Sequence, residues 1–177
     1  MKNEPEIRDL EKKKLVYSVI SKCPGIEFRE LQARTKLNMG ELRSELNYLA
    51  EQGLVIQKED ESYYRFFSKD GLSEQEKRVM LFLRQYQIRE IIIYLLQNPG
   101  SKLGEVAKKI HISNSTMIWH LKKLSDAGLL IVTHSGWPAS ARIKVAHPEM
   151  ILKLLVAYKE SFLDKMVDKF IDSWAGN

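Results

Sequence analysis

The spacing of apolar residues along the chain changes from a helical period to an alternating one, and it does so twice. Residues 39–52 and 114–127 carry apolar side chains four and three positions apart, which predicts helices with one buried face. Residues 54–67 and 129–146 alternate with a period of two around a polar turn, which predicts two β-hairpins. The apolar positions of the two helices are Leu42, Leu46 and Leu49 in the first, and Met117, Leu121 and Leu124 in the second.

Two further helices are predicted ahead of helix 39–52 and two ahead of helix 114–127, and the second of each pair is short. The first of each pair ends at Pro-Gly, because proline cannot continue a helix, and a polar turn separates the second from the long helix. These helices cover about residues 7–22, 28–35, 87–97 and 103–110. Gly53 and Gly128 follow the long helices, where a left-handed residue commonly ends a helix.

The recurrence of these elements is a repeat with an offset of 75 residues. The stretch "PGIEFRELQARTKLNMGELRSELNYLAEQGLVI" (24–56) aligns without a gap with "PGSKLGEVAKKIHISNSTMIWHLKKLSDAGLLI" (99–131), and eight positions are identical. The identical residues include the Pro-Gly before the helices and the Gly-Leu after them, so we infer a tandem duplication. Three helices followed by a hairpin form a winged helix-turn-helix unit.

The second copy, "LGEVAKKIHISNSTMIWHLKKLSDAGLL" (103–130), resembles the core of the ArsR/MarR-like winged helix-turn-helix transcriptional regulators of prokaryotes and archaea. A Ser-x-Ser-Thr helix start and a His-Leu-Lys-Lys-Leu run carry the likeness. The resemblance covers residues 87–147, and residues 11–68 more loosely through the repeat. It implies a DNA-binding repressor or activator, usually dimeric, with helix 114–127 in the major groove.

These elements predict a mainly α fold with small β-hairpin wings (α+β): two tandem winged helix-turn-helix units and a long C-terminal helix. The expected domains are residues 1–71, 72–147 and 148–177. The first domain balances 13 Lys and Arg against 13 Asp and Glu, whereas the second has 11 against 5. A basic segment is either a solvated face or a surface for nucleic acid. Because the excess lies around helix 114–127, double-stranded DNA is the favoured partner.

The start of helix 114–127 has side chains that suit contact with an anion. Ser113 is expected to cap it, and the unpaired N–H groups of its first turn favour a negative charge. The alternative is a capped surface helix that only meets solvent. Further contacts are expected from the second hairpin, where Arg142 and Lys144 alternate along one strand. The predicted DNA-binding residues are Ser113, Asn114, Ser115, Thr116, Trp119, His120, Lys123, His134, Arg142 and Lys144.

The first copy departs from this pattern, because Glu41 and Glu45 stand where the second copy has Thr116 and His120. Asn38 and Glu41 are predicted to form a capping box, and a carboxylate in the first helical turn would repel a phosphate. We therefore expect the first copy to contribute weakly to DNA binding or to serve as an interaction module. Its candidates for weaker DNA contacts are Lys36, Arg43 and Asn47.

Two helical segments lie outside the three-helix pattern. Ser73 and Glu76 predict a capping box at the start of a helix that extends toward residue 97, with a break around 85–88. From Pro148, a predicted helix of about 26 residues carries an apolar stripe, which indicates either packing on its own chain or a homodimer interface. The expected dimer residues are Leu155, Tyr158, Phe162, Met166, Phe170 and Trp174.

No sequence motif indicates catalysis. The chain has no glycine-rich phosphate loop, paired metal-ligand motif or nucleophile elbow, so we expect no enzyme activity, no cofactor and no metal. A single cysteine, Cys23, and a charged N-terminus favour the cytoplasm, and no apolar run is long enough to span a membrane. The alternative function is a tandem winged-helix protein-interaction module, of the kind found in chromosome-condensation, transcription-factor or sorting-complex subunits.

Overall fold

The structure is a computed structural model, and it describes residues 4–60, 63–133 and 141–175. It divides into two compact units: Met1–Leu81 with Glu160–Leu163, and Phe82–Lys159 with Asp164–Asn177. Helices dominate, and each unit has one small antiparallel sheet. The predicted mainly helical α+β winged-helix fold is confirmed.

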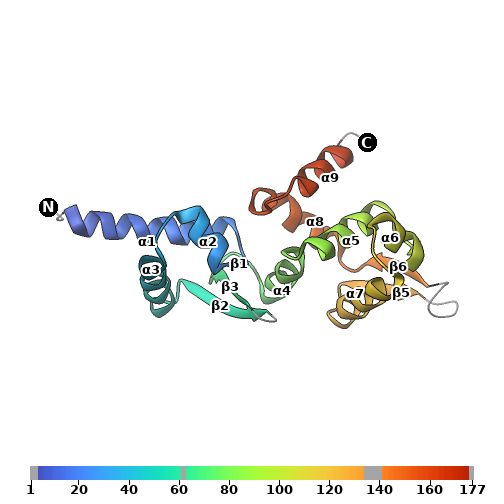
Figure 1. Ribbon diagram of the computed structural model, residues 1–177, viewed down its shortest axis with the longest axis horizontal. Coiled ribbons are helices and arrows are strands. Elements are labelled where there is room, and N and C mark those ends of the chain that lie inside the picture. The colour runs from blue at the N-terminus through green and yellow to red at the C-terminus, as the bar shows by residue number, and fades with distance from the viewer. Residues whose placement is uncertain (1–3, 61–62, 134–140, 176–177) are drawn as a thin grey trace. The chain divides into compact units, whose positions relative to one another are not determined.

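The first unit surrounds one core with helices and a three-stranded sheet. Figure 1 shows its elements in blue to green: α1 (Glu4–Lys22), β1 (Ile26–Glu27), α2 (Phe28–Thr35), α3 (Met39–Glu51), β2 (Val55–Asp60) and β3 (Tyr63–Ser68). The strand order is β1-β3-β2, with both pairs antiparallel. Leu42, Leu46 and Leu49 of α3 are buried together with Val16 and Ile20 of α1, so the predicted buried face of this helix is confirmed.

The second unit has the same order of elements. They are α5 (Tyr86–Gln97), β4 (Ser101–Lys102), α6 (Leu103–Lys109), α7 (Asn114–Asp126), β5 (Leu130–Thr133) and β6 (Arg142–Val145) (Figure 1). The strand order is β4-β6-β5, again antiparallel. Met117, Leu121 and Leu124 of α7 are buried, as their spacing predicts. The two-residue strands β1 and β4 were not predicted, because two residues show no period.

Corresponding turns of the two units have the same backbone conformation. Gly53 and Gly128 follow α3 and α7 with φ of 66° and 72°, which confirms the predicted left-handed residues. Lys36 and His111 lie in the turns that lead into these helices, and both have a φ of 58°. A residue other than glycine is strained in the left-handed conformation, because its Cβ crowds the backbone. Each turn therefore depends on the packing of the helices on either side of it.

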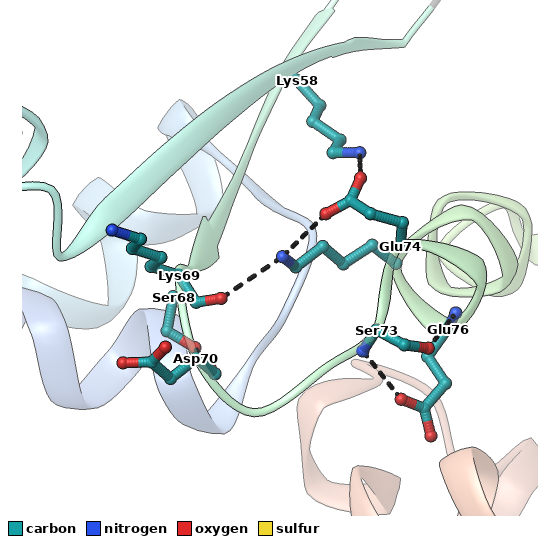
Figure 2. A network of polar contacts seen from close by, with 8 residues as sticks. Lys58, Ser68, Lys69, Asp70, Ser73, Glu74 and Glu76 are labelled. Atoms are coloured by element: carbon teal, nitrogen blue, oxygen red, sulfur yellow. Dashed lines mark hydrogen bonds and ion pairs between the residues drawn. The ribbon is translucent and has the colours of Figure 1, made fainter.

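A capping box begins α4 (Glu74–Leu83), the helix that follows the first sheet. The Glu76 amide donates to Ser73 Oγ at 3.2 Å, and the Ser73 amide donates to Glu76 Oε2 at 2.9 Å, which confirms the predicted box. Figure 2 shows that Glu74 also joins this helix start to Lys58 of β2. The Lys58 and Lys77 ammonium groups hold the pKa of Glu74 below its ordinary value. These contacts anchor the start of α4 to the hairpin of the first unit.

The C-terminal segment contains two helices, so the prediction of one long helix is wrong. α8 (Pro148–Ala157) is followed by a short 3-10 turn (Lys159–Ser161) and then by α9 (Met166–Ala175). Asp164 begins α9, because its Oδ1 accepts a hydrogen bond of 3.0 Å from the Met166 amide. The same carboxylate pairs with Arg89 of α5, whose Nη1 donates to the Leu83 carbonyl at 2.6 Å. This ion pair joins residues 75 positions apart, so the local apolar period gives no sign of the break.

Candidate nucleic-acid interface

A hydroxyl cap fixes the start of α7. Ser113 has an extended backbone, and its Oγ accepts a hydrogen bond of 3.0 Å from the Thr116 amide. The predicted capping role of Ser113 is confirmed. Thr116 Oγ1 lies 2.8 Å from Ser113 Oγ, so the two hydroxyls support each other. The first turn contains no acidic residue, and its unpaired N–H groups and positive dipole favour an anion.

The outward face of α7 presents polar side chains, apolar side chains and a cation. We call this surface the α7 face; its exposed residues are Asn114, Ser115, Ile118, Trp119 and Lys122. The indole of Trp119 is 56% exposed, although tryptophan is usually mostly buried. Lys122 was not among the predicted contacts, but the spacing of four from Asn114 through Ile118 to Lys122 identifies it as part of this face.

Lys123 lies at the edge of the α7 face and is partly buried. Its Nζ lies 5.1 Å from the centre of the Trp119 ring and 5.7 Å from the centre of the Phe82 ring. The same ammonium donates a hydrogen bond of 3.2 Å to Gln85 Oε1. These contacts hold a positive charge beside the exposed indole, since an ammonium is attracted to the face of an aromatic ring.

His120 lies in the interior, which removes it from the predicted DNA contacts. It is 5% exposed, and its Nε2 lies 3.2 Å from Gln87 Oε1 of α5. The position follows Met117 by three and precedes Leu124 by four, so it shares the buried side of the helix. Burial lowers the pKa of His120, and the nearby Lys123 ammonium lowers it further. The residue therefore fixes α7 against α5.

The sheet of the second unit carries a basic outer face. Arg142 and Lys144 of β6 are exposed, whereas Ile143 and Val145 between and beside them are buried, as the alternation predicts. Lys102 of β4 is exposed and pairs with Arg142 in the strand register, so both project from the same face. Arg142 Nη1 donates to the Gly100 carbonyl at 3.2 Å. The predicted contact His134 lies outside the described residues.

The two carboxylates that distinguish the first copy are turned toward α1. Glu41 Oε1 lies 2.7 Å from Lys12 Nζ, and Glu45 Oε2 lies 3.4 Å from Lys13 Nζ. Glu41 also completes the predicted capping box with Asn38, which is confirmed. The Lys12 ammonium, followed by the Asn38 amide, holds the pKa of Glu41 below its ordinary value. Both lysines partly offset these negative charges, so the repulsion expected for a phosphate is reduced.

The predicted weaker contacts of the first unit are all exposed. Lys36 ends α2, while Arg43 and Asn47 lie four residues apart on α3. Asn47 occupies the position that corresponds to Lys122 in the second unit. The first unit therefore presents fewer cations from its third helix than the second unit presents from α7.

Half of the predicted dimer residues pack within the chain. Leu155, Phe162 and Phe170 are 0%, 7% and 3% exposed, so we remove them from the candidate dimer surface. The reason is that the break after α8 folds the apolar stripe onto neighbouring elements. Tyr158 and Met166 are half-buried, whereas Trp174 is 50% exposed. The sequence alone showed a stripe and could not show which part of it the chain itself covers.

Comparison with known proteins identifies part of the second unit. Residues 84–131 match the family described as winged helix-turn-helix DNA-binding. This part of the second unit, from α5 through α7 to the start of β5, is therefore similar to winged helix-turn-helix DNA-binding domains. A protein of Methanocaldococcus jannaschii, named as an uncharacterized HTH-type transcriptional regulator, is 38% identical over 63 residues. The aligned region is 36% of this chain and spans about 15% of the length of that relative.

A crystal structure of a conserved hypothetical protein from Chlorobium tepidum is similar over 85% of this chain and 99% of that chain. The sequence identity is 16% and the TM-score is 0.26. A TM-score this low supports no conclusion about a shared fold.

No described helix is both long and apolar enough to cross a membrane. Within the same part of the chain, His, Cys, Asp and Glu side chains form no group of three that is suited to a metal ion.

Proposed function

We propose that this protein is a sequence-specific DNA-binding transcriptional regulator of the ArsR/MarR-like type. In this proposal, α7 enters the major groove of double-stranded DNA and the β5–β6 hairpin contacts the backbone. The observation that carries the proposal is the α7 face, whose polar and cationic side chains lie in the segment that matches a DNA-binding family. The Methanocaldococcus jannaschii relative, which is named as a transcriptional regulator, supports the regulatory part of the proposal.

The exposed side chains suit different parts of a duplex. Asn114 and Ser115 are short, lie in the first turn, and can exchange hydrogen bonds with base edges or phosphates. Trp119 offers an apolar surface of the kind that packs against a thymine methyl group. Lys122 and Lys144 are exposed cations, which suit phosphates and release counterions on binding.

A salt titration of duplex binding tests this assignment. The full chain is titrated against a selected duplex and a random duplex by fluorescence anisotropy over a range of salt concentrations. If the α7 face and β6 contact phosphates, Lys122→Ala and Lys144→Ala each weaken both complexes and reduce the slope of log K against log salt by about 1. Asn114→Ala is expected to reduce the preference for the selected duplex by about 1–3 kcal/mol.

Lys169→Ala is the matched control, because Lys169 is an exposed lysine of α9, outside the proposed interface. It is expected to leave the affinity and the salt slope unchanged. Duplex binding that is absent, that does not depend on salt, or that responds equally to Lys169→Ala contradicts the regulator assignment. That outcome favours the protein-interaction module.

We also propose that the protein acts as a homodimer through apolar side chains that α8 and α9 leave uncovered. Val156 and Trp174 are 53% and 50% exposed, and Leu152 and Ile171 are half-buried beside them. They line an apolar hollow of about 240 Å³, and the buried Phe170 lies against it without being part of the exposed surface. A second copy would cover this surface and pair two α7 helices on a palindromic DNA site.

A further inference from the structure

The first unit contains a cleft that lies outside the segment matched to the DNA-binding family. The cleft has a volume of about 800 Å³ and is lined by residues of β1, α2, α3, β2 and β3. All of these elements belong to one compact unit, so the geometry of the cleft does not depend on the placement of the second unit. The volume lies within the range of about 300–1,000 Å³ that is typical of ligand sites.

Aromatic rings line a large part of this cleft. Tyr63 and Tyr64 of β3 are 58% and 55% exposed, and Phe28 of α2 is half-buried beside the core. Phe66 also lines the cleft, but it is buried and belongs to the core of the unit. The two tyrosines are therefore the accessible aromatic side chains of the cleft, whereas the phenylalanines are more buried. Because successive strand residues point to opposite faces, Tyr64 shares the face of Phe66, and Tyr63 lines the cleft from the first position of β3. Open aromatic rings in a concave site are suited to stacking against a planar ligand.

Two guanidinium groups give the cleft a positive character. Arg29 of α2 and Arg43 of α3 line it, and the Arg43 guanidinium lies 5.9 Å from the centre of the Phe28 ring. In the described part of the chain, neither arginine forms an ion pair with a carboxylate. Glu27 also lines the cleft, and Arg65, whose Nη1 lies 3.8 Å from its Oε2, also pairs with Asp60 at 3.4 Å. The two arginines against Glu27 leave the lining with an excess of one positive charge. The occupant should therefore be an anion that also carries a planar ring.

The cleft is also lined by side-chain amides. Asn47 of α3 and Gln57 of β2 line the cleft, and both are exposed. An amide both donates and accepts hydrogen bonds, so it can pair with the edge of a nucleobase. In a duplex the base faces are stacked and the pairing edges are occupied, whereas unpaired bases present both to a protein.

We propose that this cleft binds the unpaired bases and adjacent phosphates of a single nucleic-acid strand. Tyr63 and Tyr64 stack on the bases, Arg29 and Arg43 contact phosphates, and the amides contact base edges. DNA and RNA share this chemistry. The proposal does not rest on duplex binding by α7, because it concerns different residues in the other unit.

Aromatic residues, methionine and arginine are also enriched at protein–protein interfaces, and Met39, which is 52% exposed, lines this cleft as well. Two arginines without carboxylate partners favour an occupant with regularly spaced negative charges, which a nucleic-acid strand has. A protein partner is therefore the competing outcome of the experiment.

The experiment compares strands that differ only in their bases. The full chain is titrated by fluorescence anisotropy with labelled oligodeoxythymidine, oligouridine, a blunt duplex and an abasic strand of equal length. Stacking predicts that an abasic strand binds at least about tenfold more weakly than a strand with bases. Tight binding of oligodeoxythymidine or of oligouridine identifies the source as DNA or RNA, and either result supports the proposal.

Matched variants separate stacking from charge. The double variant Tyr63→Leu/Tyr64→Leu is expected to weaken strand binding by about tenfold or more, whereas Tyr63→Phe/Tyr64→Phe retains the rings and should remain within about twofold. Both tyrosines are more than half exposed, and an unchanged circular dichroism melting curve confirms that the leucine variant folds. Arg43→Gln weakens binding most at low salt. Lys169→Ala, at an exposed lysine outside both proposed sites, leaves strand binding unchanged.

Three results would overturn the proposal. They are equal affinity for the abasic and thymidine strands, equal effects of the leucine and phenylalanine variants, and no detectable binding of any single strand. The last result would favour a protein partner for the cleft. None of the three bears on duplex binding by α7, so the two proposals can fail separately.

Discussion

Replacing Asp164 by asparagine is expected to destabilise the second unit by about 2–3 kcal/mol. Asp164 pairs with Arg89, whose side chain is 5% exposed, whereas the carboxylate itself remains 28% exposed. The substitution keeps the shape and the side-chain oxygen that can cap α9, but it removes the negative charge that Asp164 places beside a buried guanidinium. The Leu83 carbonyl, 2.6 Å from Arg89 Nη1, continues to satisfy part of that group.

The magnitude follows from the burial of the two partners. Removing one partner of a fully buried ion pair costs about 3–5 kcal/mol, because the remaining charge stays desolvated. An exposed pair contributes about 0–1 kcal/mol. The partial exposure of Asp164 allows water to reach the vacated side of the guanidinium, which places the expected cost between these limits.

Arg89→Met should be milder than Asp164→Asn, because methionine removes the buried charge and fills similar space. The double variant should be close to Arg89→Met alone, which gives a coupling energy of about 2 kcal/mol in a double-mutant cycle. Urea unfolding followed by tryptophan fluorescence measures these values for the second unit. Trp119, Trp137 and Trp174 all follow residue 81, so the first unit contributes no tryptophan signal.

The reasoning is refuted if Asp164→Asn costs less than about 0.5 kcal/mol, a value within the range of an ordinary surface substitution. It is also refuted if the double variant is less stable than the wild type by the sum of the two single losses. Additive effects would show that the two side chains do not interact. The break between α8 and α9 would then need another cause.

Two further predictions concern His120 and the apolar surface of α8 and α9. Because the pKa of folded His120 lies below its ordinary value of 6.5, protonation favours the unfolded chain, and stability is lost as pH falls below that value. His120→Gln should lessen this loss, and an NMR titration of the ring that gives a pKa of 6.5 or higher would contradict the assignment. Val156→Asp should convert the proposed dimer to a monomer in light scattering, whereas Lys169→Asp, also at an exposed position, should not. A monomeric native chain would refute the dimer.

The repeat explains why so much of the fold could be predicted. The third helices, the hairpins and the capping boxes depend on residues within a few positions of one another. For the third helices and the hairpins, two aligned copies also give each pattern an independent check. Ser113 and Asn38 cap corresponding helices, and both were recognisable from their neighbours. The ion pair between Arg89 and Asp164 has no such local signature.

The candidate site was harder to predict than the fold. The sequence placed His120 and Lys123 on the DNA-binding side because they follow a polar helix start. The structure shows that His120 and its counterpart Glu45 both face the first helix of their units, where Gln87 and Lys13 meet them. The difference between His120 and Glu45 therefore affects how the third helix of each unit packs on the first helix. It is no sign that the first copy lost a DNA contact.

The sequence by itself determined the order of elements, the buried faces of α3 and α7, the helix caps and the concentration of positive charge in the second copy. Each of these follows from residues close together in the chain. Only the tertiary structure decided which side chains of α7 are exposed, which part of the C-terminal stripe is covered, and that Tyr63, Tyr64, Arg29 and Arg43 line one cleft. These outcomes depend on contacts between distant segments, and periodicity within one segment carries no information about its neighbours in space.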